Sequence, residues 1–246
     1  REASLEPSLE VGLPSDVSLF AVFDGHCGAR AAAFLQSRFP AFLAGEHDLL
    51  RTHGEEALRR AFRRAEAEWL AFAGADDHMD GSTAAVAVLL PGQCLIGNVG
   101  DSEVVLGTRN GHGRVEVRVL TELHSPSRNE AEARRVEALG VGLRQGRLAH
   151  PRFNPRVLSL AVSRAIGDLG FKDARFTGGA PSGLSARPFV ASVGVSAGSC
   201  LLLGCDGFWG SVSYLQAVQT AFARLDDGLS NQAVSEHLVR LALEGG

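Results

Sequence analysis

The sequence has few cysteines and no long apolar run. Its 4 cysteines are scattered over 246 residues, and no two of them form a Cys-x-x-Cys pair. This excludes a dense disulfide framework and a cysteine-based zinc clip, and it favours a reducing compartment. No apolar stretch approaches the ~20 residues of a membrane-spanning helix, and no signal segment opens the chain. We therefore expect an intracellular protein, cytoplasmic or nuclear, with a targeting segment upstream of Arg1 left open.

The sequence also lacks an excess of charge of one sign. The formal net charge is −4 and the sequence pI is about 6.1. This balance gives no reason to expect binding to nucleic acid or to an anionic membrane. Arginines do gather between positions 59 and 64, but glutamates interleave with them on a helical pattern, which indicates a solvated helix face. No pattern argues for an oligomer, so a monomer is expected.

The chain is long and apolar enough to bury a sizeable core. With 45% hydrophobic residues over 246 positions, it is expected to form one domain that spans residues 1–246. Apolar residues at three-and-four spacing predict helices over residues 29–43, 55–73, 127–139, 213–224 and 230–243. The helix over 127–139 is expected to have Ser127 as its N-cap.

Apolar runs bounded by turn residues predict strands over residues 18–23, 83–90, 94–99, 104–108, 114–120, 190–195 and 200–203. Asn110-Gly111 separates two of these runs and predicts a hairpin, which a doubly wound parallel sheet would not contain. We therefore expect an α+β fold, an α-β-β-α sandwich of two antiparallel sheets flanked by helices. The glycine- and proline-rich segment 177–187 is expected to be a flexible excursion from this fold.

Acidic turns end several predicted strands. Asp24-Gly25-His26 follows the first strand, Asp206-Gly207 follows the last, and Asp101 follows the strand over 94–99. A single Asp-Gly pair is usually only a turn. Repeated at the ends of strands in facing sheets, however, such turns can bring Asp24 and Asp206 together as oxygen ligands for a hard divalent cation, with His26 beside them as a proton donor.

Five motifs carry a resemblance to a known family. In chain order they are Asp24-Gly25-His26, Gly81-Ser82-Thr83-Ala84, Asn98-Val99-Gly100-Asp101-Ser102, the run from Leu160 to Asp168, and Cys205-Asp206-Gly207-Phe208-Trp209. Their order and spacing resemble those of the metal-dependent protein phosphatases of the 2C type. The resemblance implies a β-sandwich with flanking helices, two Mg²⁺ or Mn²⁺ ions, and hydrolysis of phosphoserine and phosphothreonine in a phosphoprotein substrate.

The resemblance also implies roles for individual residues. Asp24 resembles the carboxylate that bridges both metals, Asp206 and the Gly25 carbonyl resemble ligands of one metal each, and His26 resembles the general acid. Arg1 and Glu6 stand in the places of a phosphate-binding arginine and a metal-binding acid, and Asp101 matches an acid of a weaker third metal site. His124 is expected to be structural, and Arg164 and Asp168 are expected to hold the loop beside the site without a catalytic step.

Departures from the family pattern leave a second hypothesis open. Leu5 replaces a glutamate, Gly210 replaces an aspartate of the third metal site, and the final Asp-Asn motif is not found before Gly246. An incomplete ligand set predicts a site that fills only at millimolar metal. The alternative is a catalytically impaired phosphatase-like domain that serves as a binding or scaffold module. A calcium-binding structural domain is disfavoured, because no loop of closely spaced carboxylates is present.

Overall fold

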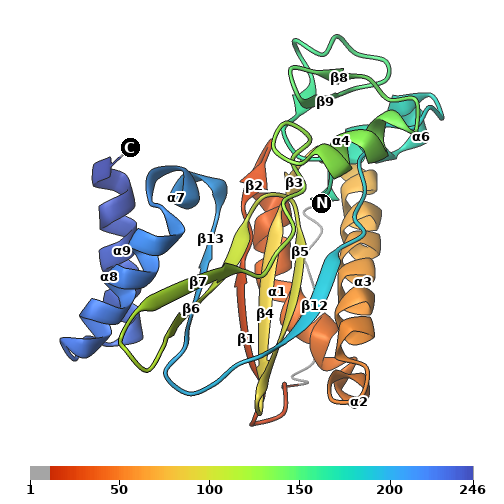
Figure 1. Cartoon of the computed structure of the whole chain (residues 1–246). Coiled ribbons are helices and arrows are strands. Elements are labelled where there is room, and N and C mark those ends of the chain that lie inside the picture. Colours follow the sequence, from red (N-terminus) through yellow and green to blue (C-terminus); the bar gives the residue numbers. More distant parts are fainter. Residues whose placement is uncertain (1–11, 246) are drawn as a thin grey trace.

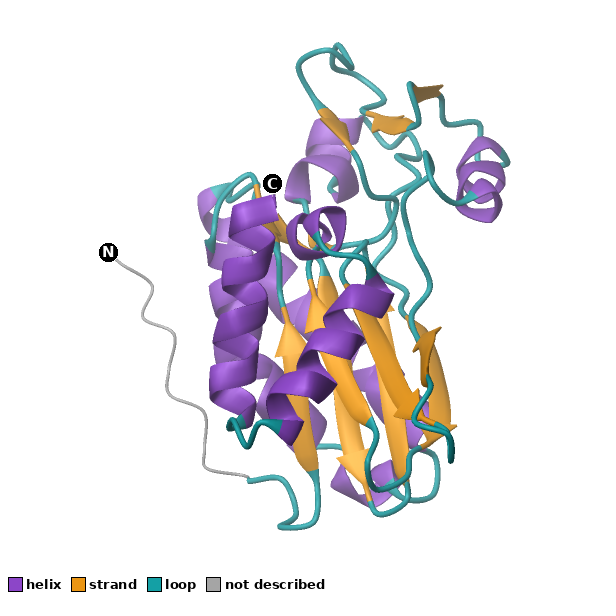
Figure 2. Cartoon of the chain, turned by 60° about the vertical axis from the view of Figure 1, so that its left-hand side comes forward, coloured by secondary structure: helices purple, strands orange, loops and turns teal. Residues whose placement is uncertain are grey.

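The computed structural model describes residues 12–245, and these form four layers. Two antiparallel sheets pack face to face, and helices cover the outer face of each sheet (Figures 1 and 2). This is the α-β-β-α sandwich expected from the sequence. No helix among residues 12–245 has the length and apolar character required to cross a membrane.

The first sheet has the order β1-β4-β5-β12. Its strands are β1 (Ser18–Val22), β4 (Ala84–Leu90), β5 (Gln93–Val99) and β12 (Phe189–Gly194). The helices packed on it are α1 (Arg30–Ala44), α2 (His47–Leu50) and α3 (Gly54–Asp76). Buried aromatic side chains of α1 and α3 fill the space between helices and sheet, with Phe39 and Phe62 in edge-to-face contact at 5.1 Å.

The second sheet has the order β13-β6-β7. Its strands are β6 (Glu103–Arg109), β7 (Val115–Val119) and β13 (Cys200–Gly204). After β13 the chain forms the short helix α7 (Asp206–Ser211) and then α8 (Tyr214–Asp226) and α9 (Asn231–Gly245). Val218, Phe222 and Leu238 of α8 and α9 cover the outer face of this sheet.

Strand β4 shows why the apolar runs of the first sheet do not alternate with polar residues. Val86 and Val88 pack in the core under α1 and α3, whereas Ala85 and Ala87 face the second sheet. Because successive side chains of a strand point to opposite faces, a strand buried on both faces is apolar throughout. The alanines face Val104 and Leu106 of the second sheet within the core between the sheets.

Short elements gather at one end of the sandwich. One small sheet joins β11 (Ile166–Gly167), β3 (Gly81–Ser82) and β2 (Gly25–His26), in that order. Another joins β10 (Ser159–Leu160), β9 (Arg147–Ala149) and β8 (Leu143–Arg144). The helices of this end are α4 (Glu130–Glu137), α5 (Leu169–Lys172) and α6 (Ala174–Thr177) (Figure 1).

One local expectation was wrong. The N-cap of α4 is Asn129 rather than Ser127, because the Asn129 side chain accepts hydrogen bonds from the backbone N–H groups of Ala131 and Glu132. The hairpin predicted around Asn110-Gly111 is confirmed between β6 and β7, and its loop closes at Gly113, where φ is +75°. Short helices α2 and α7 were not expected.

The segment 177–187 is also more firmly held than a flexible excursion. The Ser185 N–H donates to the Ser163 carbonyl at 3.1 Å, and the Ser185 carbonyl accepts from Ala165 at 3.0 Å. Ser182 and Gly183 are buried. These contacts fix the end of the loop against the strand-like run from Ser163 to Ala165.

Candidate metal and phosphate site

The carboxylates of Asp24 and Asp206 lie close together. One oxygen of each, together with the Cys205 sulfur, falls within a group whose atoms all lie within 4.8 Å of one another. Asp24 follows β1 in the first sheet and Asp206 begins α7 directly after β13 in the second. Residues 182 positions apart are thus brought to one mouth of the sandwich because their strands end there. Cys205 is a neighbour of this pair that was not expected from the sequence.

Backbone hydrogen bonds hold the Asp24 turn in place. The Asp24 carbonyl accepts from the Thr83 N–H at 2.9 Å and from the Ser82 hydroxyl at 3.2 Å. The Thr83 hydroxyl in turn lies 2.7 Å from that of Ser102, next to Asp101. The Gly81-Ser82-Thr83 motif therefore ties the acidic turn of β1 to the acidic turn that follows β5.

Asp101 belongs to the same electrostatic cluster. Burial and the charges of Asp206 and Asp24 raise the pKa of Asp101 to about 6, opposed in part by its backbone hydrogen bond and the positive charge of Arg128. Burial and the neighbouring Asp206 also raise the pKa of Asp24. The charge of Asp206 thus disfavours ionisation of Asp24 and Asp101, and the charge of Asp24 disfavours ionisation of Asp101, as expected for crowded acids.

His26 lies beside this cluster and is oriented by Asp168. The His26 Nε2 atom is 2.7 Å from Asp168 Oδ1, and Asp168 is only 2% exposed. Burial disfavours the charged ring, but the hydrogen bond and charge of Asp168, with the charges of Asp24 and Asp101, outweigh it and raise the pKa of His26. Sequence reasoning placed Asp168 near the site but missed its contact with His26, since the two residues are 142 positions apart.

Asp80 is a second buried acid that sequence reasoning missed. Its carboxylate accepts a hydrogen bond from the Arg30 N–H at 3.0 Å, at the start of α1, where Ala29 supplies no side-chain cap. Gly28, with φ of +143°, leaves room for it, because a Cβ there would lie 2.0 Å from Asp80 Oδ2. Asp80 therefore caps α1 and fixes the segment just after His26.

Of the other positions that the family resemblance singled out, Gly25 and Gly210 lie within the described residues. Gly25 lies in β2, paired with Ser82 of β3, so its carbonyl belongs to the same acidic turn as Asp24. Gly210 lies in α7, and a Cβ at this position would meet no atom within 4 Å. Arg1, Glu6 and Leu5 lie outside the described residues.

A sequence profile of the family named Protein phosphatase 2C matches residues 2–246. The chain belongs to the protein phosphatase 2C family. Curated relatives include "Probable protein phosphatase 1N" of Homo sapiens, 35% identical, with 94% of this chain and 51% of the relative covered. "Protein phosphatase 1F" of Homo sapiens is 34% identical, with 95% and 47% covered. The chain thus spans about half the length of these relatives.

Solved structures agree with the protein phosphatase 2C fold. A serine-threonine phosphatase 2C from Toxoplasma gondii matches with a TM-score of 0.70 and 23% identity, over 94% of this chain and 80% of the other. A phosphatase from a pathogenic strain of the same organism matches with a TM-score of 0.72 and 20% identity, over 95% and 82%. At these identities the likeness concerns the fold.

The acidic cluster fits the divalent cations on which this family generally depends. Asp24, Asp101 and Asp206 offer hard oxygen ligands, and no lysine or arginine among the described residues forms an ion pair with any of them. Crowded carboxylates with raised pKa values are stabilised by Mg²⁺ or Mn²⁺, which both prefer oxygen donors. The donor set is therefore suited to the cofactor.

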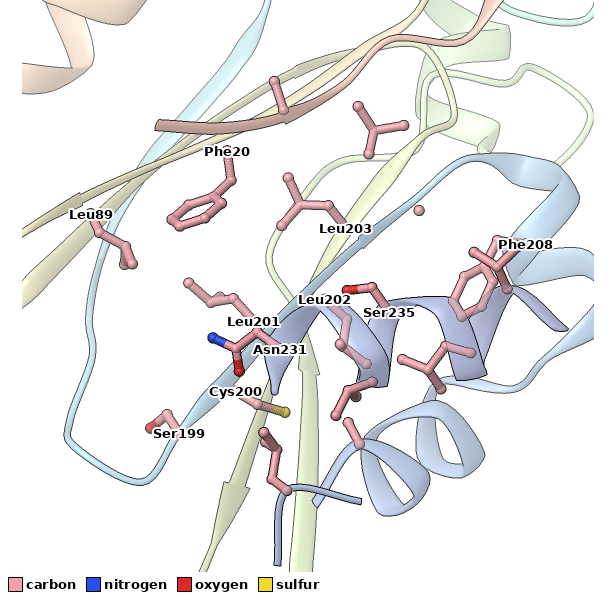
Figure 3. A pocket seen from close by; sticks show the side chains of 18 of the residues that line it. Phe20, Leu89, Ser199, Cys200, Leu201, Leu202, Leu203, Phe208, Asn231 and Ser235 are labelled. Carbon is pink, nitrogen blue, oxygen red and sulfur yellow. The ribbon is translucent and has the colours of Figure 1, made fainter. Parts of the chain in front are cut away.

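A separate apolar cavity lies along the side of the molecule. It measures about 900 Å³ and lies between β1, the open edge of β13 and helix α9, with Phe20, Leu201 and Leu203 among its lining residues (Figure 3). One end reaches Cys205, but none of its described lining residues is charged. A phosphoryl group needs charged partners, so the acidic cluster and not this cavity is the candidate site.

Proposed function

We propose that this chain is a metal-dependent phosphatase domain that hydrolyses phosphoserine and phosphothreonine in proteins. The observation that carries the proposal is the convergence of Asp24, Asp101 and Asp206 beside a histidine held by a buried aspartate. Membership of the protein phosphatase 2C family and the names of the relatives support it.

Asp24, Asp206 and the Gly25 carbonyl would hold the ions, with Asp101 at a further position and Glu6 as another acid by family resemblance. Bound Mg²⁺ or Mn²⁺ would supply an acidified water for attack on phosphorus and would offset charge on the phosphoryl oxygens. The protein's part is to keep these carboxylates at one mouth of a rigid sandwich. Arg1 is the proposed phosphate-binding residue, again by resemblance.

His26 is the proposed general acid. Its Nε2 donates to Asp168, so Nδ1 is the ring nitrogen left to donate a proton to the departing serine or threonine oxygen. The raised pKa of His26 keeps the ring protonated closer to neutral pH. Asp168 acts through His26 and is a positioning residue.

The alternative, an impaired phosphatase-like binding module, draws its support from Gly210 and Leu5 at acidic positions of the family. The Asp24–Asp206 pair is nevertheless retained. The three remaining carboxylates and the oriented histidine favour the enzyme, because a binding module has no need to crowd carboxylates whose charges raise the pKa values of Asp24 and Asp101.

Phosphate release from p-nitrophenyl phosphate and from a phosphothreonine peptide tests the proposal, each measured in Mn²⁺ and in EDTA. The unchanged chain should show activity only with metal, and Asp206→Ala should reduce it by about 10²-fold or more, as for loss of a metal ligand. Asp226→Ala, a matched change at an exposed aspartate paired with Arg109, should leave it unchanged. Absence of any metal-dependent difference between the unchanged chain and Asp206→Ala would leave only the binding module.

His26→Gln separates proton donation from other roles of this residue. We expect a larger loss with the phosphothreonine peptide than with p-nitrophenyl phosphate, because only the alkoxide leaving group needs a proton. His112→Gln, in the exposed loop between β6 and β7, is the matched control. Equal losses with both substrates would remove His26 from the acid role.

A further inference from the structure

A second pocket is polar and rich in arginine, and it lies at the same end of the sandwich as the acidic cluster. It measures about 290 Å³ and lies between α3, α4 and the loop that leads into β12. Four arginines line it, accompanied by one carboxylate, and these residues are Arg59, Arg135, Arg164, Arg187 and Glu122. They come from segments far apart in the chain, so no local motif announces the pocket.

Two of the arginines are fixed in place. Arg135 and Arg164 both donate to the buried carboxylate of Glu132, Arg135 at 3.1 Å through Nε and Arg164 at 2.5 Å through Nη2. Arg135 also donates to the carbonyls of Ser163 and Gly183, each at 3.1 Å, and Arg164 donates to the Arg187 carbonyl at 3.1 Å. These guanidinium groups are therefore preorganised, which lowers the entropic cost of binding a ligand.

The pocket retains positive charge and unused donors. Glu132 forms ion pairs with two arginines. Within residues 12–245, Arg59 forms an ion pair only with the half-exposed Glu55, at 3.0 Å. Arg187 is exposed, and its guanidinium makes no hydrogen bond or ion pair within residues 12–245. The Nε atom of Arg164 is buried without a hydrogen-bond acceptor, although such a donor costs free energy when it is left unpaired.

The pocket and the acidic turns lie at the same end of the sandwich. Phe189, in the pocket wall, pairs with Asn98 of β5, which precedes Asp101 by three positions. The Asn98 side chain donates to the Glu122 carbonyl at 2.7 Å, so it links the Asp101 turn to the other side of the pocket. Strand geometry places Asp101 on the order of 10–15 Å from Phe189, within reach of one extended peptide.

We propose that this arginine pocket binds a phosphoryl group other than the one being hydrolysed. Guanidinium groups recognise phosphate oxygens with paired hydrogen bonds. A dianion also suits the charge of this site, because its four arginines outnumber the three nearby carboxylates, Glu55, Glu122 and Glu132. Two sources share this chemistry, a second phosphorylated residue of the substrate protein and free inorganic phosphate. The first source rests on the proposed function. With either source, the segment 177–187 contributes to binding through Arg187.

Binding is tested without turnover. Inorganic phosphate is titrated by calorimetry and by amide NMR into the Asp206→Ala chain in EDTA, where the acidic cluster holds no metal that could bind the anion. We expect binding that perturbs the amides of residues 185–190 and that weakens about tenfold in Arg59→Ala/Arg187→Ala, the cost of lost charge-assisted hydrogen bonds. Arg63→Ala, one turn along α3 and outside the pocket, should bind as the parent does.

Kinetics in Mn²⁺ then separate the two sources. If the substrate supplies the phosphoryl group, a doubly phosphorylated peptide should have a KM about fivefold or more below that of its singly phosphorylated form. The double variant Arg59→Ala/Arg187→Ala should abolish this difference in KM. The same variant should not change turnover of p-nitrophenyl phosphate. If the two peptides behave alike while inorganic phosphate binds at residues 185–190, free phosphate is the ligand. Absence of phosphate binding there together with equal KM values, or binding that the double variant leaves intact, overturns the proposal. Because the titration needs no activity, an inactive enzyme would not affect it.

Discussion

Glu132 and Asp101 show how neighbouring groups decide the ionisation of single residues. Burial disfavours the charged form of both Glu132 and Asp101. Glu132 nevertheless has its pKa lowered to about 2, because Arg164, Arg135 and Ser163 donate hydrogen bonds to it. Asp101 faces other carboxylates, and its pKa is raised to about 6. Glu132 is therefore a structural anchor, whereas Asp101 is suited to a cation.

Glu132→Gln is expected to lower the free energy of unfolding at pH 7 by about 3 kcal/mol, since it leaves two arginines without their buried counter-charge. The folded pKa lies below the ordinary value of 4.5, so this stabilisation is complete above about pH 4.5 and is lost as pH falls toward 2. Urea unfolding at several pH values measures both effects.

In that experiment the variant should lose less stability than the unchanged chain as pH falls through this window. Glu130→Gln provides the control, because Glu130 is an exposed neighbour that forms an ion pair with Arg134. Identical pH dependence in the unchanged chain and Glu132→Gln would contradict the assignment of Glu132 as the anchor.

The small sheet of β2, β3 and β11 is the element that brings His26 and Asp168 together in the proposed catalytic site. His26 of β2 lies opposite Gly81 of β3, and Gly81 pairs with Gly167 of β11, directly before Asp168. Position 81 requires glycine because no space is left for a side chain, and not because of its backbone conformation. A Cβ there would lie 2.2 Å from Asp168 Oδ2 and 2.4 Å from His26 Nε2. The register of three two-residue strands thus determines the His26–Asp168 hydrogen bond.

Gly81→Ala should separate His26 from Asp168 and reduce turnover of a phosphothreonine peptide by about 10- to 100-fold, the range of a weakened general acid. The pKa of His26, followed by NMR, should fall because the ring loses the partner that raises it. Gly111→Ala is the control, since a Cβ there meets no atom within 4 Å. Full activity of Gly81→Ala, with the His26 pKa unmoved, would show that this contact has no role.

At the scale of the whole molecule, the sandwich concentrates negative charge at one mouth. Strands of both sheets end there, so Asp24, Asp101 and Asp206 are neighbours although each belongs to a different connection. Without a cation these carboxylates repel one another and oppose folding. We therefore expect a bound divalent cation to stabilise the folded chain.

Asp206→Asn tests this coupling. In EDTA the variant should be more stable than the unchanged chain by about 1 kcal/mol, because one like charge is removed from the cluster. Mn²⁺ should raise the melting temperature of the unchanged chain, by the equivalent of about 2.7 kcal/mol at a hundredfold excess over Kd, and leave the variant nearly unaffected.

Thermal unfolding in EDTA and in MnCl₂ gives both comparisons, with Asp226→Asn as a surface control. A melting temperature that metal raises equally in the unchanged chain and Asp206→Asn would exclude Asp206 as a ligand. A variant less stable than the unchanged chain in EDTA would contradict the repulsion between carboxylates.

Local patterns in the sequence were sufficient for the layered fold and for the residues of the acidic turns. Apolar period determines which face of a helix or strand is buried, and the motif around Asp24, Gly25 and His26 needs only neighbours in the chain. Tertiary structure alone decided three features. These are the contact of His26 with Asp168, the approach of Cys205 to Asp24, and the arginine pocket. These depend on which distant segments the topology brings together, and the spacing of residues along one segment carries no record of its partners across the fold.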